Sequence, residues 1–170
     1  MLNITLKGGV VKEFEAGTTV LEVAKSLGGG FYKQVYCGMV DGEVVDLRYP
    51  LAKDCELILC TFEDEAGKKA FWHTATHVMA QAVKRLYPET KLAIGPAIEG
   101  GFYYDFDRKP AFGPEDLEKI EGEMKKIVKE ALPIQRFTLP VDEALELVKD
   151  EPYKQELIKE HADAGEEISF

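Results

Sequence analysis

The chain has 170 residues, of which 45% are hydrophobic and 31% are charged, and its formal net charge is −10 at pH 7. This length suffices for one large domain or two small ones, each with its own buried core. Affinity for nucleic acid normally depends on basic side chains that neutralise phosphates, so a chain this acidic is expected to bind RNA weakly on its own. No apolar run approaches the roughly 18 residues of a membrane span, and the N-terminus lacks the features of a signal peptide, so we expect a cytoplasmic protein with no membrane partner.

The cysteines give no sign of a disulfide framework. The chain has three of them, Cys37, Cys55 and Cys60, without C-x-x-C spacing. Disulfides are not expected in a cytoplasmic protein. Because Cys55 and Cys60 lie in or beside an apolar run, we predict small core residues rather than metal ligands or nucleophiles.

The stretch up to residue 62 predicts a small sheet folded over one helix. Thr19-Val20-Leu21-Glu22 has the form of a capping box, and Gly28-Gly29-Gly30 ends the helix that the box opens. Alternating or apolar residues between turn signals predict strands on either side of this helix. The predicted strands are residues 1–6, 10–14, 34–40, 43–47 and 56–61. The order ββαβββ can close as a curved sheet, with the last and most apolar strand in its middle.

Residue 63 begins a charged, glycine-containing stretch to residue 69 that we interpret as a linker between two domains. Beyond it, apolar periodicity and breaker residues predict further helices and strands. The predicted helices are residues 70–87, a long one after Gly113-Pro114, 141–148 and 151–162, and the predicted strands are 91–94, 102–106 and 134–139. Gly100-Gly101, beside the aromatic-rich strand, indicates either close approach of backbone or ligand, or a plain hairpin turn.

Two of the three histidines, His73 and His77, lie four residues apart in a predicted helix, which places both rings on one face. The spacing fits a metal site, a pair of proton-transfer groups, or two donors to a phosphate or hydroxyl. It does not fit the metalloprotease pattern H-E-x-x-H, because Thr74 stands where that pattern needs its glutamate. An amphipathic helix that merely carries two surface histidines remains the simpler alternative.

Two longer motifs carry a resemblance to a known family. The segment His73-Thr74-Ala75-Thr76-His77 and the later segment Ile94-Gly95-Pro96-Ala97-Ile98-Glu99-Gly100-Gly101-Phe102-Tyr103-Tyr104-Asp105 resemble the N-terminal part of bacterial-type threonyl-tRNA synthetases. The resemblance covers essentially the whole chain. It implies an α+β fold, with a TGS-like β-grasp (ubiquitin-like) domain over residues 1–62 and an α+β editing domain over residues 63–170 that is incomplete at its C-terminus.

The resemblance also implies a reaction and the residues that perform it. Editing domains of this family hydrolyse serine mistakenly attached to threonine tRNA. By resemblance, His73 and His77 would position the terminal ribose and an attacking water, with Tyr104 and Lys154 near the ester. A lysine can orient water or stabilise developing negative charge, and a phenol can supply a hydrogen bond. Without the resemblance, Lys154 is a surface lysine and Tyr104 a core or interface aromatic.

One part of the family pattern is missing from this sequence. The family pairs H-x-x-x-H with a later C-x-x-x-H, which this chain lacks. We therefore expect a fragment of a longer protein, without its aminoacylation and anticodon-binding domains. Because two histidines make half of a tetrahedral zinc site, no metal or other cofactor is expected here, and ATP, magnesium and zinc are expected only in the absent catalytic domain.

The expected partner is the acceptor end of tRNA(Thr), bound by the full protein and only weakly by this fragment. Two alternatives are a non-enzymatic TGS-type module that binds RNA or a small ligand, and a free-standing editing hydrolase. The histidine pair argues against the first, and the missing C-x-x-x-H argues against the second.

Overall fold

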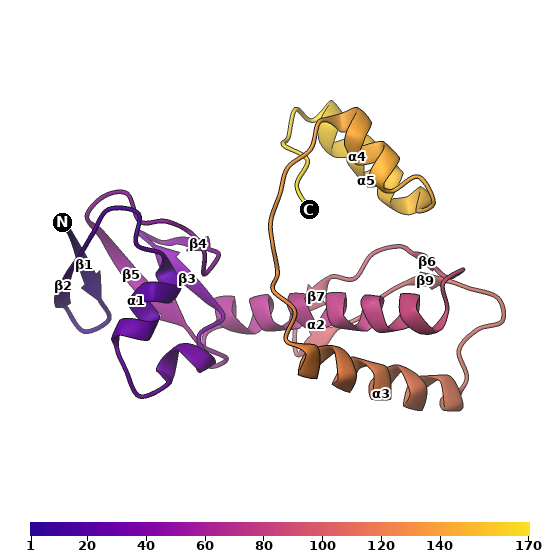
Figure 1. The fold of residues 1–170 in the computed structure, drawn as a ribbon, viewed down its shortest axis with the longest axis horizontal. Helices are drawn as coiled ribbons and strands as arrows, with labels where there is room; N and C mark the ends of the chain where they lie inside the picture. The colour runs from indigo at the N-terminus through magenta and orange to yellow at the C-terminus, as the bar shows by residue number, and fades with distance from the viewer. The chain divides into compact units, whose positions relative to one another are not determined.

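The computed structural model describes all residues, Met1–Phe170, and divides them into two compact units, Met1–Trp72 and His73–Phe170. Both units contain helices and strands, which follow one another in runs rather than in alternation, so the predicted α+β fold class is confirmed (Figure 1). No helix combines the length and the apolar character that a bilayer span requires.

The first unit is a five-stranded sheet with one α-helix. Its elements are β1 (Leu2–Leu6), β2 (Val10–Phe14), α1 (Val20–Ser26), the short 3-10 helix η1 (Phe31–Gln34), β3 (Cys37–Val40), β4 (Glu43–Val45) and β5 (Cys55–Cys60). The strand order is β2-β1-β5-β3-β4, so the most apolar strand is central, as predicted. The β1 and β5 strands pair in parallel and the other pairs are antiparallel, which is the β-grasp arrangement.

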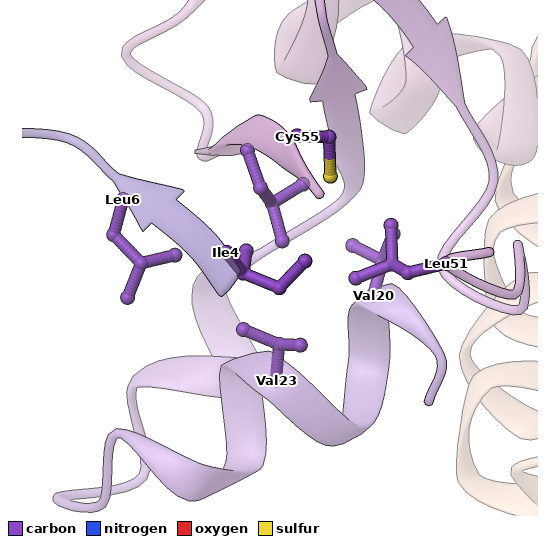
Figure 2. Close-up of a cluster of buried hydrophobic side chains, with 7 residues drawn as sticks. Ile4, Leu6, Val20, Val23, Leu51 and Cys55 are labelled. Atoms are coloured by element: carbon purple, nitrogen blue, oxygen red, sulfur yellow. The ribbon is translucent and has the colours of Figure 1, made fainter. Parts of the chain in front are cut away.

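Side chains of α1 pack with those of the sheet in one buried cluster (Figure 2). Val20 and Val23 project from α1 toward Ile4 of β1, and all three are fully buried. The predicted capping box is present: the Thr19 hydroxyl accepts from the Glu22 backbone N–H at 3.3 Å, and the Glu22 carboxylate accepts from the Thr19 N–H at 2.8 Å. The box fixes where α1 begins, and so which of its residues face the sheet.

The predicted linker over residues 63–69 is wrong, because most of it is helix. The α2 helix (Glu65–Leu86) begins at Glu65 rather than near residue 70. Asp64 closes a turn directly before the helix, because its carboxylate accepts from the Thr61 N–H at 2.7 Å, and its carbonyl accepts the first helical bond, from the Lys68 N–H, at 2.9 Å. The charged stretch therefore continues from this turn straight into α2.

The second unit combines helices with two small hairpins. Its elements after α2 are β6 (Lys91–Leu92), β7 (Ala97–Ile98), β8 (Gly101–Phe102), β9 (Phe106–Asp107), α3 (Pro114–Glu130), α4 (Val141–Leu147) and α5 (Pro152–Asp163). The β6 strand pairs with β9 and β7 pairs with β8, both antiparallel. The α2 and α3 helices share a core built on Ala82, Val83, Ile120 and Ile127. A smaller core joins α4, α5 and the chain end.

Two predicted strands differ from the structure. The strand predicted over residues 102–106 is interrupted, since only its ends fall in β8 and β9. The strand predicted over residues 134–139 is absent, and the stretch forms a single β-bridge, between Thr138 and Ser169. Its apolar side chains Ile134 and Phe137 are 66% and 47% exposed, so the apolar pattern here does not mark a core strand.

Candidate functional site

The two histidines meet on the exposed face of α2. The Nε2 atoms of His73 and His77 are 3.2 Å apart, and the ring centroids are 4.7 Å apart with the planes at 90°. A hydrogen bond at this distance needs one Nε2 as the N–H donor and the other as the acceptor, so the contact couples the tautomers of the two rings. Thr76 lies below them, 1% exposed, and its hydroxyl donates to the His73 carbonyl at 2.7 Å. The fold thus presents a proton-sharing pair to solvent.

The environment of His77 favours its neutral form. Although the side chain is solvent-exposed, protein atoms crowd its ring, and the resulting desolvation lowers the pKa of His77. The positive charges of His73 and Lys154 lower this pKa further. A neutral imidazole at physiological pH can accept a proton, which a general base requires.

Lys154 comes from α5 and lies within electrostatic reach of His77. Its Nζ donates to the carbonyl oxygen of Ala93 at 3.1 Å. Burial lowers the pKa of Lys154, and the charge of Glu151 opposes this effect. The structure therefore supports Lys154 as a half-buried amine rather than as an ordinary surface lysine.

Glu151 is a residue of this region that the sequence did not single out. One carboxylate oxygen binds Lys84 Nζ at 2.5 Å, and the other accepts from the Leu92 backbone N–H at 3.0 Å. Burial opposes ionisation, but the Leu92 N–H and the Lys84 ammonium outweigh it and lower the pKa of Glu151. These bonds attach the first turn of α5 to α2 and β6, which positions Lys154. The only sequence signal was the Glu-Pro pair at a helix start, since both partners are distant along the chain.

Tyr104 is packed between aromatic and backbone atoms. Its ring stacks on Phe106 with centroids 4.6 Å apart and planes at 18°. A Cβ at Gly95 would lie 2.2 Å from a Tyr104 ring carbon, so Gly95, and not the Gly100-Gly101 pair, is where close approach requires glycine. Burial, followed by the charge of Glu151, raises the pKa of Tyr104, so the phenol stays protonated. No hydrogen bond or ring contact joins it to the histidines.

A hollow of about 360 Å³ opens beside His77. Thr74, His77 and Gln81 line it from α2, and the rest of its lining is mostly apolar side chains from the end of α3 and the following residues. Val128 and Leu132 are 67% and 53% exposed in this lining. A cavity of this size and polarity suits a small organic group held next to an imidazole.

The donor set does not fit a zinc site. A catalytic zinc takes three protein ligands and a structural one takes four. His73 and His77 supply two, and no group of three or more His, Cys, Asp or Glu side chains that could hold a metal ion occurs in residues 1–170. The chemistry that this group of residues supports directly is proton transfer and stabilisation of developing charge.

Comparison with known proteins relates the chain to one kind of enzyme. The TGS domain family matches residues 2–61. Over its whole length the chain is 57% identical to the threonine–tRNA ligase of Clostridium botulinum (strain Eklund 17B), 56% to that of Acetivibrio thermocellus and 55% to that of Clostridioides difficile. It spans 26% to 27% of the length of these relatives, or about a quarter.

Proposed function

This chain is related along its whole length to threonine–tRNA ligases and begins with a TGS domain, and we propose that it is the N-terminal part of such an enzyme, with a site that proofreads the charged tRNA. The proofreading reaction is hydrolysis of serine from mischarged seryl-tRNA(Thr). The observation that carries the proposal is the histidine pair of α2, with Nε2 atoms 3.2 Å apart.

The need for such a reaction follows from the size difference between the two amino acids. Serine lacks only the methyl group of threonine, and a pocket gains roughly 1 to 3 kcal/mol from such a group. That difference allows too many errors for translation, so a second site that hydrolyses the smaller product supplies the remaining discrimination.

The proposed step is attack of water on the ester carbonyl carbon. The neutral imidazole of His77 accepts a proton from water as the new carbon–oxygen bond forms. The ester bond to the ribose then breaks, and the proton passes to the departing ribose oxygen. His77 donates from Nε2–H to His73 Nε2, which leaves the His77 Nδ1 free to take the proton from water, and His73 donates to the terminal ribose from its own Nδ1–H. The products are serine and a tRNA with a free terminal hydroxyl.

Lys154 and Tyr104 have supporting roles in this proposal. The Lys154 amine, fixed by the Ala93 carbonyl and by the Glu151 anchor of α5, stabilises negative charge on the tetrahedral intermediate. Tyr104, whose pKa is raised, stays protonated, so its phenol can donate a hydrogen bond to the ester group. The hollow beside His77 is of a size to hold part of the terminal adenosine.

The acceptor end of tRNA(Thr) is the proposed partner in the full protein. With a net charge of −10, this chain is expected to hold RNA weakly by itself. ATP, magnesium and zinc would serve the aminoacylation part of the full protein, and the proposed hydrolysis uses none of them.

Deacylation of seryl-tRNA(Thr) tests the proposal. We would compare this chain and a full-length threonine–tRNA ligase, each with and without the substitution His73→Ala. The assignment is supported if serine is released and His73→Ala reduces the rate by about a hundredfold or more, which is the usual contribution of a positioned proton-transfer group. The assignment is contradicted if neither the wild-type chain nor the wild-type full-length enzyme releases serine.

The matched control is His161→Ala, which removes the remaining histidine, an exposed side chain of α5 that pairs with Glu166. Its hydrolytic rate should equal that of the wild type. Equal losses in His73→Ala and His161→Ala would mean that the α2 pair has no special role.

A further inference from the structure

A second hollow, of about 430 Å³, lies in the second unit apart from the histidine pair. Its lining comes from the end of α2, from β6 and from the stretch around β9, and it includes Thr90, Lys91, Arg108 and Lys109. None of the four residues assigned to hydrolysis lines it. Its properties therefore do not depend on the editing reaction.

Arg108 is fixed in orientation by two aromatic rings. Its guanidinium carbon lies 4.0 Å from the centroid of the Tyr87 ring and 4.8 Å from that of Phe112. Tyr87 is itself held, because its hydroxyl donates to the Asp116 carboxylate at 2.6 Å. The rings thus restrict the rotamers of a long side chain before any ligand arrives.

The N–H groups of Arg108 have no partner. No hydrogen bond or ion pair engages the guanidinium, and its Nη1 is buried without an acceptor. The Asp116 carboxylate is close enough to interact electrostatically with Arg108, but its bonds go to Tyr87 and to the Gly113 N–H. An arginine presents five donors in a planar fork, and leaving all of them unmatched beside a cavity is costly unless a ligand or solvent satisfies them.

Thr90 is a second unmatched polar group in the same lining. Its side chain is 2% exposed, and its hydroxyl has no hydrogen-bond partner. A buried hydroxyl without a partner costs free energy that a bound acceptor would recover. Two residues with a buried, unpartnered donor atom, Arg108 and Thr90, therefore line the same cavity.

Charge identifies the ligand class. Lys91, Arg108 and Lys109 bring three positive charges to the hollow, against the carboxylates of Glu89 and Asp107. Asp107 is engaged by the Tyr153 hydroxyl at 3.0 Å, and Lys91 Nζ donates to the Asp150 carbonyl at 2.8 Å. The lining thus has three basic and two acidic side chains, a net positive charge on a chain whose net charge is −10, which points to recognition of a specific anion.

We propose that this hollow binds a phosphate group, with the Arg108 fork as its main ligand and the Thr90 hydroxyl and Lys109 ammonium as further donors. A planar guanidinium binds two phosphate oxygens at once, which lysine cannot do. The cavity exceeds the size of a bare phosphate, so the group belongs either to a small phosphorylated molecule such as a nucleotide or to the backbone of an RNA. Phosphate recognition is common to both sources.

Titrations followed by ¹⁵N NMR at constant ionic strength test the proposal with three probes. The probes are inorganic phosphate, adenosine 5′-monophosphate and a short RNA duplex, and the observed signals are the Arg108 side-chain Nε–Hε and the Thr90 amide. We expect saturable shifts of both signals. The substitution Arg108→Gln should weaken binding about tenfold or more, and Arg108→Lys should weaken it less, because it keeps the charge and loses the fork.

Arg136→Gln is the matched control, since it removes the same charge from an exposed arginine that pairs with Glu167 and lies outside the hollow. Saturation by phosphate or the nucleotide identifies a small-molecule site, and saturation by RNA alone identifies a backbone phosphate. No saturable shift with any probe, or equal affinities of Arg108→Gln and Arg136→Gln, overturns the proposal. If Arg108→Gln does not fold, as judged by circular dichroism, the affinities of the wild type and of Arg108→Lys are compared instead. Equal affinities of these two would then overturn the proposal.

Discussion

The contact between His73 and His77 limits how many protons the pair can hold. With Nε2 atoms 3.2 Å apart, a pair in which both rings are positively charged would set two Nε2–H groups against each other. The contact therefore disfavours a second positive charge on the pair, and Lys154 adds to that cost. The pair can therefore take a proton from water only while the imidazole of His77 is neutral.

The titration of His77 checks this description. Its pKa should lie below the ordinary value of 6.5 because of desolvation and then because of the charges of His73 and Lys154. The substitution Lys154→Met should raise it, as NMR of the imidazole nitrogens would show. Lys159→Met removes the same charge from an exposed position of α5 and should leave it unchanged. An equal His77 titration in wild type and Lys154→Met would exclude the proposed electrostatic link.

The same lowered pKa links the stability of the fold to pH. The unfolded chain binds a proton at His77 near pH 6.5, and the folded chain binds it only at lower pH. The contribution of His77 to stability is therefore complete above pH 6.5 and is lost as the pH falls toward the folded-state pKa. The neutral base, and with it the proposed hydrolysis, persists to more acidic pH than an unperturbed histidine allows.

Two helical glycines should respond oppositely to the same substitution. In α2, a Cβ at Gly67 would lie 1.9 Å from the carbonyl oxygen of Thr61, whereas at Gly122 of α3 it would meet nothing within 4 Å. We expect Gly67→Ala to destabilise the chain by about 3 kcal/mol through overpacking against backbone. Gly122→Ala should stabilise it by up to about 1 kcal/mol through helix propensity. Urea unfolding measures both, and a neutral Gly67→Ala would contradict the packing of α2 against Thr61.

Local signals predicted the elements that local chemistry determines. The Thr19–Glu22 capping box and the proline at the start of α3 each act within a few residues, and the structure has α1 and α3 there. The early start of α2 was missed because the turn that Asp64 forms with Thr61 was taken for part of a charged linker. The strand predicted at residues 134–139 is reduced to the Thr138–Ser169 bridge, and no local pattern shows how much of such a stretch finds a partner distant along the chain.

The candidate site was predictable only in part for the same reason. Spacing alone placed His73 and His77 on one face of a helix, and the rings do meet. Lys154 and Tyr104 were named by family resemblance, and their roles stay predictions. Glu151 was missed because its partners Lys84 and Leu92 are 67 and 59 residues away along the chain. Arg108 could not be identified from the sequence, since its aromatic clamp is a tertiary feature.

At the scale of the whole molecule, the two units have separate cores and should respond separately to core mutations. Trp72, the single tryptophan, packs edge-on against Phe62 and Phe71 in the first unit, so its fluorescence reports on that unit. Val23→Ala should lower the stability seen by fluorescence by about 2 kcal/mol or more.

Ile127→Ala, in the core shared by α2 and α3, should lower the free energy of unfolding by about 3 kcal/mol when unfolding is followed by circular dichroism. The unfolding transition followed by tryptophan fluorescence should change little. The comparison needs both variants and both probes in the same denaturant series. Parallel shifts of the two signals in either variant would show that the units unfold as one.

The three thiols of the first unit have a practical consequence for spectroscopy. Cys37, Cys55 and Cys60 are all buried, and desolvation raises the pKa of Cys37 to about 12 and raises the pKa values of the other two. Alkylating dyes react with the thiolate, which is scarce at neutral pH in such positions. A cysteine introduced on the surface of either unit could therefore be labelled selectively without removing the native ones, so that single-molecule distances between the units become measurable in an otherwise unaltered chain.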